Sequence, residues 1–192
     1  MEFEAVQLRA SDHSALEFAL ILVRESFAYM NQRVSPPSSI ERLTLEGMQL
    51  MAQQGEVWVL YALDGRPQGI DSVQSTSVSL REVQLGHGSL ESSVPRPVAC
   101  VCLQPMPSAK LLYLGRLAVA PSFRGFKLGR WLLCHAAVRA RQLDLSCVEL
   151  KTRVELVENH AIFRKLGFVQ VATGRHEGFS RPTYIVMHRY LL

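Results

Sequence analysis

The sequence contains no apolar run near the roughly 20 residues that a membrane-spanning helix needs, although 48% of its 192 residues are hydrophobic. Its first residues, Met1–Ala5, lack the basic start and the apolar stretch of a secretory signal peptide. These two absences predict a cytoplasmic protein with no membrane partner.

Cysteines are few and are not spaced for a metal site. The four are Cys100, Cys102, Cys134 and Cys147, and no pair has the C-x-x-C spacing. Cys100 and Cys102 lie on one face of a predicted strand, where free thiols pack as small apolar groups. We therefore expect no metal and no disulfide framework, as is typical of a reducing compartment.

Charge is not strongly of one sign either. The formal net charge is +4, and the basic residues are spread along the chain. This pattern does not indicate a nucleic-acid partner. It is compatible with solvated helix faces or with an anionic ligand.

The hydrophobic pattern predicts a single domain over 1–192 in which helices and strands are mixed. Helices are predicted over 12–31, 38–54, 125–142 and 159–166, and strands over 57–62, 98–103, 111–119, 147–153, 168–172 and 183–190. Pro105 and Pro107 are expected to break the chain. The polar stretch over about 68–96 predicts an insertion between two sheet strands, with one extra strand over 76–83.

The most informative segment joins a predicted strand to a helix through Pro121, Arg124, Gly125, Lys127 and Gly129. The first N–H groups of a helix have no partner within the helix, and its dipole adds partial positive charge there. Such a turn binds phosphate or pyrophosphate. The alternative is an ordinary strand-turn-helix with glycines for packing. Neither a Walker loop nor the G-x-G-x-x-G dinucleotide pattern is present.

Two blocks resemble the GCN5-related N-acetyltransferase (GNAT) superfamily. The run LAVAPSFRGFKLG (117–129) resembles its acetyl-CoA-binding motif, and ENHAIFRKLGF (158–168) resembles its second block, a short helix ending in Leu-Gly-Phe. The resemblance implies an α/β (α+β) fold. A central mixed, mostly antiparallel twisted sheet would be flanked by helices, and its splayed central strands would form an acyl-CoA cleft. It also implies an N-acetyltransferase that moves an acetyl group from acetyl-CoA to a primary amine by direct attack in a ternary complex.

By the same resemblance, backbone groups of the strand would pair with pantetheine and those of the following turn would hold the pyrophosphate. The implied co-substrate-binding residues are Leu117, Ala118, Val119, Arg124, Gly125, Phe126, Lys127, Leu128, Gly129, Arg130, Asn159 and Phe163. Two positions depart from the family. Lys127 replaces the usual middle glycine, and Phe163 replaces a tyrosine that protonates the leaving thiolate.

Catalytic candidates remain several. Glu149 lies on the strand expected to line the cleft and is a candidate base, directly or through water, as are Glu155, Glu158 and His160. Tyr113 occupies the position where relatives commonly carry the base, four residues before Leu117. Tyr113 and Tyr184 are the candidate acids.

The acceptor is predicted to be an amine of a small molecule or a peptide. Its site would be built by Tyr29, Arg33, His176 and Arg181, and a carboxylate or phosphate beside the amine would fit Arg33 or Arg181. A homodimer is left open as a partner. The alternatives are a CoA-binding regulatory or interaction module without transferase activity, and a scaffold whose insertion binds a partner.

Overall fold

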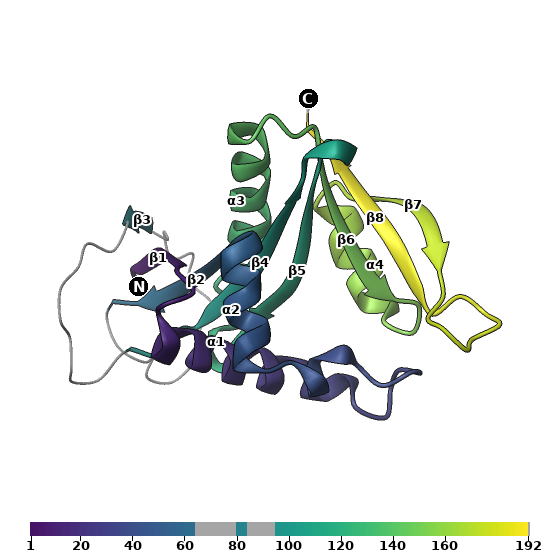
Figure 1. The fold of residues 1–192 in the computed structure, drawn as a ribbon, viewed down its shortest axis with the longest axis horizontal. Coiled ribbons are helices and arrows are strands. Elements are labelled where there is room, and N and C mark those ends of the chain that lie inside the picture. The colour runs from purple at the N-terminus through teal and green to yellow at the C-terminus, as the bar shows by residue number, and fades with distance from the viewer. Residues whose placement is uncertain (64–79, 84–94, 192) are drawn as a thin grey trace.

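The protein is built on one sheet that carries helices on both faces (Figure 1). The computed structural model describes residues 1–63, 80–83 and 95–191. The strands are β1 (Phe3–Leu8), β2 (Glu56–Ala62), β3 (Leu80–Val83), β4 (Ala99–Met106), β5 (Leu111–Val119), β6 (Cys147–Arg153), β7 (Val169–Gly174) and β8 (Tyr184–Tyr190). The helices are α1 (His13–Phe27), α2 (Leu45–Gln54), α3 (Leu128–Gln142) and α4 (Val157–Lys165), with short 3-10 turns that include η1 (Ala28–Met30) and η2 (Ser39–Arg42).

The strand order is β3-β1-β2-β4-β5-β6-β8-β7. Only the β1–β3 and β5–β6 pairs are parallel, and the other pairs are antiparallel. This confirms the expected mixed, mostly antiparallel sheet. No helix in the described part of the chain is long and apolar enough to cross a membrane.

Two hydrophobic cores lie on opposite faces of the sheet. Along β2, Val57 and Val59 pack with α1 and α2, whereas Trp58 and Leu60 pack with α3. Alternate side chains of a strand point to opposite faces, so a strand buried on both sides must be apolar throughout. The run predicted as a doubly buried strand therefore has that environment.

A mostly buried ion pair joins α3 to β2. Arg139 donates to both carboxylate oxygens of Glu56, from Nε at 2.9 Å and from Nη2 at 2.6 Å. Trp58 Nε1 adds a third hydrogen bond to the same carboxylate at 2.7 Å. Burial alone would raise the pKa of Glu56, but the hydrogen bonds from Arg139 and Trp58 outweigh it and leave this pKa below its ordinary value.

The second predicted helix, over 38–54, is wrong in its first third. The structure forms η2 there, and α2 begins only at Leu45. Thr44 is extended, and its side-chain oxygen accepts the N–H of Gly47 at 3.2 Å. Thr44 is thus an N-cap, and a cap residue has non-helical dihedrals, so the two segments cannot form one helix.

Three strands differ from the predictions. β1 was not predicted at all. β4 continues through Pro105 to Met106, although Pro105 was expected to break it. Because β4 pairs with β2 only as far as Leu103, one side of Pro105 has no strand to which an N–H would donate. β3 covers the end of the strand predicted over 76–83; residues 76–79 and most of the 68–96 insertion lie outside the described residues.

Candidate functional site

The central strands β5 and β6 separate along their length. They pair only over Leu111–Leu114 and Cys147–Leu150. Beyond this point β5 stays with β4 and β6 stays with β8, and a cavity of about 1070 Å³ opens between them. The divergence predicted for these strands is therefore present.

A bulge in β5 lies where the strands part. Cys100 and Cys102 of β4 face Ala118 and Gly115, so one intervening residue of β4 opposes two of β5. One of those two, Arg116, has a φ of +56°, which is rare in a strand. A bulge bends its strand and strengthens the local twist. It therefore directs the second half of β5 away from β6.

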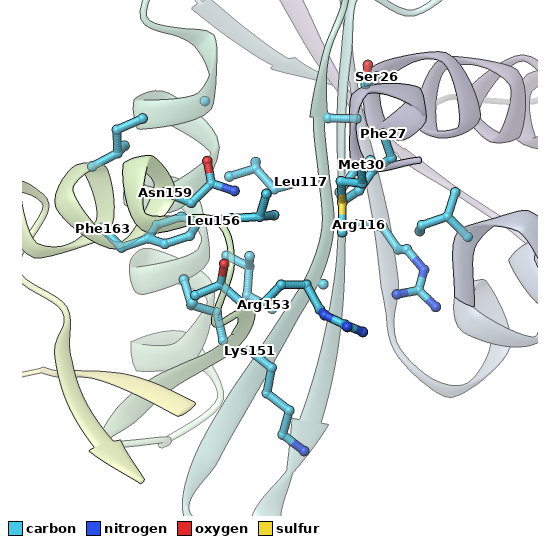
Figure 2. A pocket seen from close by; sticks show the side chains of 18 of the residues that line it. Ser26, Phe27, Met30, Arg116, Leu117, Lys151, Arg153, Leu156, Asn159 and Phe163 are labelled. Atoms are coloured by element: carbon cyan, nitrogen blue, oxygen red, sulfur yellow. The ribbon is translucent and has the colours of Figure 1, made fainter. Parts of the chain in front are cut away.

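Helices close the cavity on several sides (Figure 2). Ser26 and Tyr29 come from α1 and η1, Gly129 and Arg130 from α3, and Asn159 and Phe163 from α4. The strand residues Leu117, Ala118 and Val119 also line it, as does Arg124 before α3. These positions include eight of the twelve residues predicted to bind the co-substrate.

The turn before α3 differs from the prediction, because the helix begins at Leu128 and not near Gly125. Gly125 has a φ of +92° and Lys127 a φ of +60°. Two left-handed residues keep the chain out of helical geometry until Leu128. Phe126 packs against the rings of Phe3 and Phe123, and Leu128 is buried. The Leu128 side chain therefore cannot meet a ligand, and Phe126 is only partly exposed.

Two tyrosines and a lysine form a cluster in the lining of the cavity. The Nζ of Lys151 lies 5.6 Å from the ring centres of both Tyr113 and Tyr184. Burial raises the pKa of the Tyr113 phenol above its ordinary value; the charge of Arg116 opposes this rise, and Glu149 adds to it. Tyr113 is therefore a protonated, hydrogen-donating group at neutral pH.

The Tyr184 ring packs over Gly174, which has no side chain. A Cβ added to Gly174 of β7 would lie 2.2 Å from the Tyr184 ring, so the ring occupies the space of the missing side chain. His176 packs edge-on against the same ring at 5.4 Å. Tyr184 and His176 both line the cavity.

Glu149 is not among the residues that line the cavity. Its Cα pairs with Tyr113 in the parallel β5–β6 ladder. Its carboxylate lies 2.8 Å from Nε2 of His188 on β8. Of the three predicted catalytic residues, Tyr113 and Tyr184 therefore come together around Lys151. Glu149 lies outside the cavity lining.

The predicted acceptor residues divide into two groups. Tyr29, Arg33 and His176 line the cavity, and Arg181 does not. The Asn159 amide donates to the Tyr29 hydroxyl at 3.2 Å, and Arg33 pairs with Glu158 at 2.6 Å. These contacts join η1 and the residues after it to α4 across the cavity.

His176 is held by Thr183. The Thr183 hydroxyl accepts the backbone N–H of His176 at 2.9 Å and lies 2.6 Å from its Nδ1. Partial burial lowers the pKa of His176 below its ordinary value, the charge of Arg153 lowers it further, and Glu155 opposes both. With its pKa below the ordinary value, the imidazole is mostly in its neutral form at pH 7.

Comparison with known proteins gives the same architecture. The model of the Acetyltransferase (GNAT) family matches residues 84–168. The acetyltransferase of GNAT family from Staphylococcus aureus superposes with a TM-score of 0.65 at 12% identity, covering 99% of each chain. The ribosomal-protein-S18-alanine N-acetyltransferase from Escherichia coli gives 0.60 at 15% identity, covering 98% of this chain and 94% of that one. A chain of the NatC complex bound to Gag peptide and CoA gives 0.61 at 16% identity, covering 100% of both chains.

The chain has the GNAT fold. This result confirms the resemblance to the GNAT superfamily that residues 117–129 and 158–168 carry, and with it the predicted fold class. Among curated proteins none matches the sequence.

Sequence reasoning missed three residues of the GNAT cavity: Arg116, Lys151 and Arg153 all line it. A signal for them was present. Each is a cation inside a predicted strand, next to the expected point of divergence, and a long charged side chain in such a strand needs either water or a partner.

Proposed function

We propose that this GNAT-fold protein is an N-acetyltransferase that transfers an acetyl group from acetyl-CoA to a primary amine of a small molecule or peptide. The observation that carries this proposal is the cavity between β5 and β6. It reaches from Arg124, Gly129 and Arg130 at one end to Tyr113 and Tyr184 at the other. It can therefore hold a phosphate-bearing donor and an acceptor together.

The residues at the α3 end fit the anionic part of CoA. Arg124, Arg130 and Lys165 line the cavity, and no side chain caps the first turn of α3. The free N–H groups and the helix dipole favour an anion there. Lys127 replaces the family's glycine. Its backbone N–H is still available to a ligand, and its backbone is left-handed.

The pantetheine arm would lie on the half of β5 that β6 leaves, beside Leu117 and Val119. The Val119 carbonyl already accepts a hydrogen bond from Ser26 at 3.3 Å, and it has a second lone pair for a ligand. Asn159 and Phe163 line the same region from α4. The NatC complex, one chain of which has a similar fold, is bound to Gag peptide and CoA.

Acetyl transfer forms a C–N bond and breaks a C–S bond. The amine must first lose a proton, and the departing thiolate then accepts one. Tyr113, which is protonated at neutral pH, is our candidate donor to the sulfur, and Tyr184 lies in the same cluster around Lys151. Glu149 lies outside the lining, so it would accept the amine proton only through water. Orientation of the two reactants by the cavity supplies much of the acceleration.

Thermal unfolding with acetyl-CoA, CoA or ATP tests the co-substrate site, because a ligand of the native state raises its melting temperature. We expect acetyl-CoA and CoA to raise it and ATP not to. An Arg124→Ala, Gly129→Glu variant should lose the effect. Thiol release on a panel of primary amines then tests transfer. No stabilisation by either CoA compound would overturn the proposal.

A second candidate is a CoA-binding module without transfer. Phe163 favours it, because phenylalanine has no proton to give where relatives carry a tyrosine. Saturable CoA binding with no turnover on any amine of the panel would select this alternative.

A further inference from the structure

The cavity is strongly cationic. Among the described residues that line it are seven lysines or arginines and one carboxylate, that of Glu158. The cations are Arg33, Arg116, Arg124, Arg130, Lys151, Arg153 and Lys165. Arg124, Arg130 and Lys165 lie at the end proposed for CoA, and Arg33 is paired with Glu158. Arg116, Lys151 and Arg153 remain for the acceptor end.

Arg116 is held at the bulge of β5, directly before Leu117. Its Nε is buried and has no hydrogen-bond partner in the part of the chain that the structure describes. Its positive charge lowers the pKa of the proposed acid Tyr113, against the larger effect of burial. A guanidinium nitrogen that is removed from water without a partner costs free energy.

Arg153 presents the same situation from β6. The residue is 8% exposed, and its Nη2 is buried without a hydrogen-bond partner among the described residues. Its ion pair with Glu155 is long, 3.5 Å from Nε, and that carboxylate also accepts the N–H of Ser35. Figure 2 shows the Arg153 side chain extending from β6 toward β5, the strand that carries Arg116.

Arg116 and Arg153 line one cavity from β5 and β6, and each has a buried guanidinium nitrogen without a hydrogen-bond partner among the described residues. Such a pair can bind an oxyanion, because arginine matches carboxylate and phosphate with two parallel N–H bonds. We propose that the acceptor carries a carboxylate or phosphate close to its amine, and that Arg116 and Arg153 bind this anion. The proposal rests on the transferase function above. It moves the anion site predicted at Arg33 or Arg181 to the interior of the cavity.

Lys151 contributes to anion binding differently from the two arginines. Its Nζ is shared between the faces of Tyr113 and Tyr184, which already supply cation–π partners. It adds long-range attraction for an anion and keeps the two phenols in place. The directional hydrogen bonds come from the arginines.

Matched acceptor pairs test the proposal on protein saturated with CoA. The pairs are β-alanine with β-alaninamide, O-phosphoethanolamine with ethanolamine, and Asp-Ala-Ala-amide with Asn-Ala-Ala-amide. They separate a small carboxylate, a phosphate and an acidic peptide. Calorimetry measures binding without turnover, and thiol release from acetyl-CoA measures kcat/KM.

We expect wild type to bind at least one anionic member about tenfold or more tightly than its neutral partner. Arg116→Gln and Arg153→Gln should each weaken the anionic member by about 10- to 100-fold, since hydrogen bonds between charged groups are the strong ones. The neutral member should change by less than about threefold. Arg175→Gln, an equal charge change at an exposed arginine outside the cavity lining, is the control. Arg153→Lys should recover only part of the loss, because lysine lacks the bidentate fork.

A CoA-induced rise in melting temperature shows that each variant is folded with its co-substrate end intact. Equal affinity for both members of all three pairs, or no binding of any probe, would overturn the anion site even if neutral amines are acetylated. Selective binding of an anion with no thiol release would support the anion site and overturn the transferase proposal instead.

Discussion

His188 and Glu149 face each other across β8 and β6, with Nε2 of His188 2.8 Å from Oε2 of Glu149. This contact holds the carboxylate outside the cavity, beside Tyr113 in the neighbouring strand. Glu149 therefore affects the site mainly through its charge, which raises the pKa of Tyr113 together with the larger effect of burial.

Glu149→Gln should move the alkaline limb of the kcat–pH profile to lower pH. The proposed acid must be protonated, so activity falls as pH rises through the pKa of Tyr113. Removing the negative charge lowers that pKa, and the fall then begins earlier. Glu17→Gln, on the exposed face of α1, serves as the control. An unchanged alkaline limb would exclude this coupling.

Tyr113→Phe should lower kcat by about 100-fold, the usual contribution of a positioned acid. The affinity for CoA should not change, because the phenol lies at the other end of the cavity. Tyr184→Phe removes the matching hydroxyl from the same cluster and should cost less than about tenfold. Steady-state kinetics with calorimetric CoA binding measures both. A larger loss in Tyr184→Phe would assign the acid role to that residue.

Arg153→Gln should raise the pKa of His176. Partial burial lowers this pKa first, and the charge of Arg153 lowers it further; the variant removes only the second effect. Histidine titration followed by NMR reports the shift directly. Arg141→Gln, at the end of α3, should leave it unchanged. A constant value in Arg153→Gln would mean that the guanidinium does not act on the ring.

Glu56→Gln should destabilise the fold by roughly 2 to 3 kcal/mol, because it removes the negative charge from a mostly buried, hydrogen-bonded ion pair. The pKa of Glu56 is lower in the folded protein than its ordinary value. Its stabilising effect is therefore complete above the unfolded pKa and is lost as pH falls through the folded one. Urea unfolding at pH 7 and at lower pH should show wild type losing more stability on acidification than the variant.

Lys127→Gly should raise the free energy of unfolding by roughly 0.5 to 1 kcal/mol. Lys127 has a φ of +60°, a region that glycine occupies without strain. Affinity for CoA should stay within about threefold, because the backbone N–H remains. Lys127→Ala removes the same charge but keeps the strain, so it should give no gain. Equal stability of the two variants would contradict this account.

The sequence predicted strands and the co-substrate end well, because both depend on local patterns. The strands over 111–119 and 147–153 have the bounds that were expected. The split of the second helix was missed because Thr44 caps a new helix inside a continuous apolar pattern.

The acceptor end was less predictable because it is made by long-range pairing. The bulge at Arg116 depends on how β4 and β5 align, and the burial of Arg153 depends on β8 and the loop before it. Arg33 and Arg181 have the same chemistry in the sequence as Arg116 and Arg153. Only tertiary structure separates an arginine on the rim from one inside.

The short β5–β6 ladder also marks the boundary between two consecutive segments of the chain. Every described strand on the β5 side of the sheet precedes residue 143, and every described strand on the β6 side follows residue 146. A cut in the loop between α3 and β6 would therefore yield two uninterrupted fragments whose shared boundary contains the cavity. Such a pair would serve as a complementation reporter in which molecules that fill the cavity favour reassembly of the two fragments.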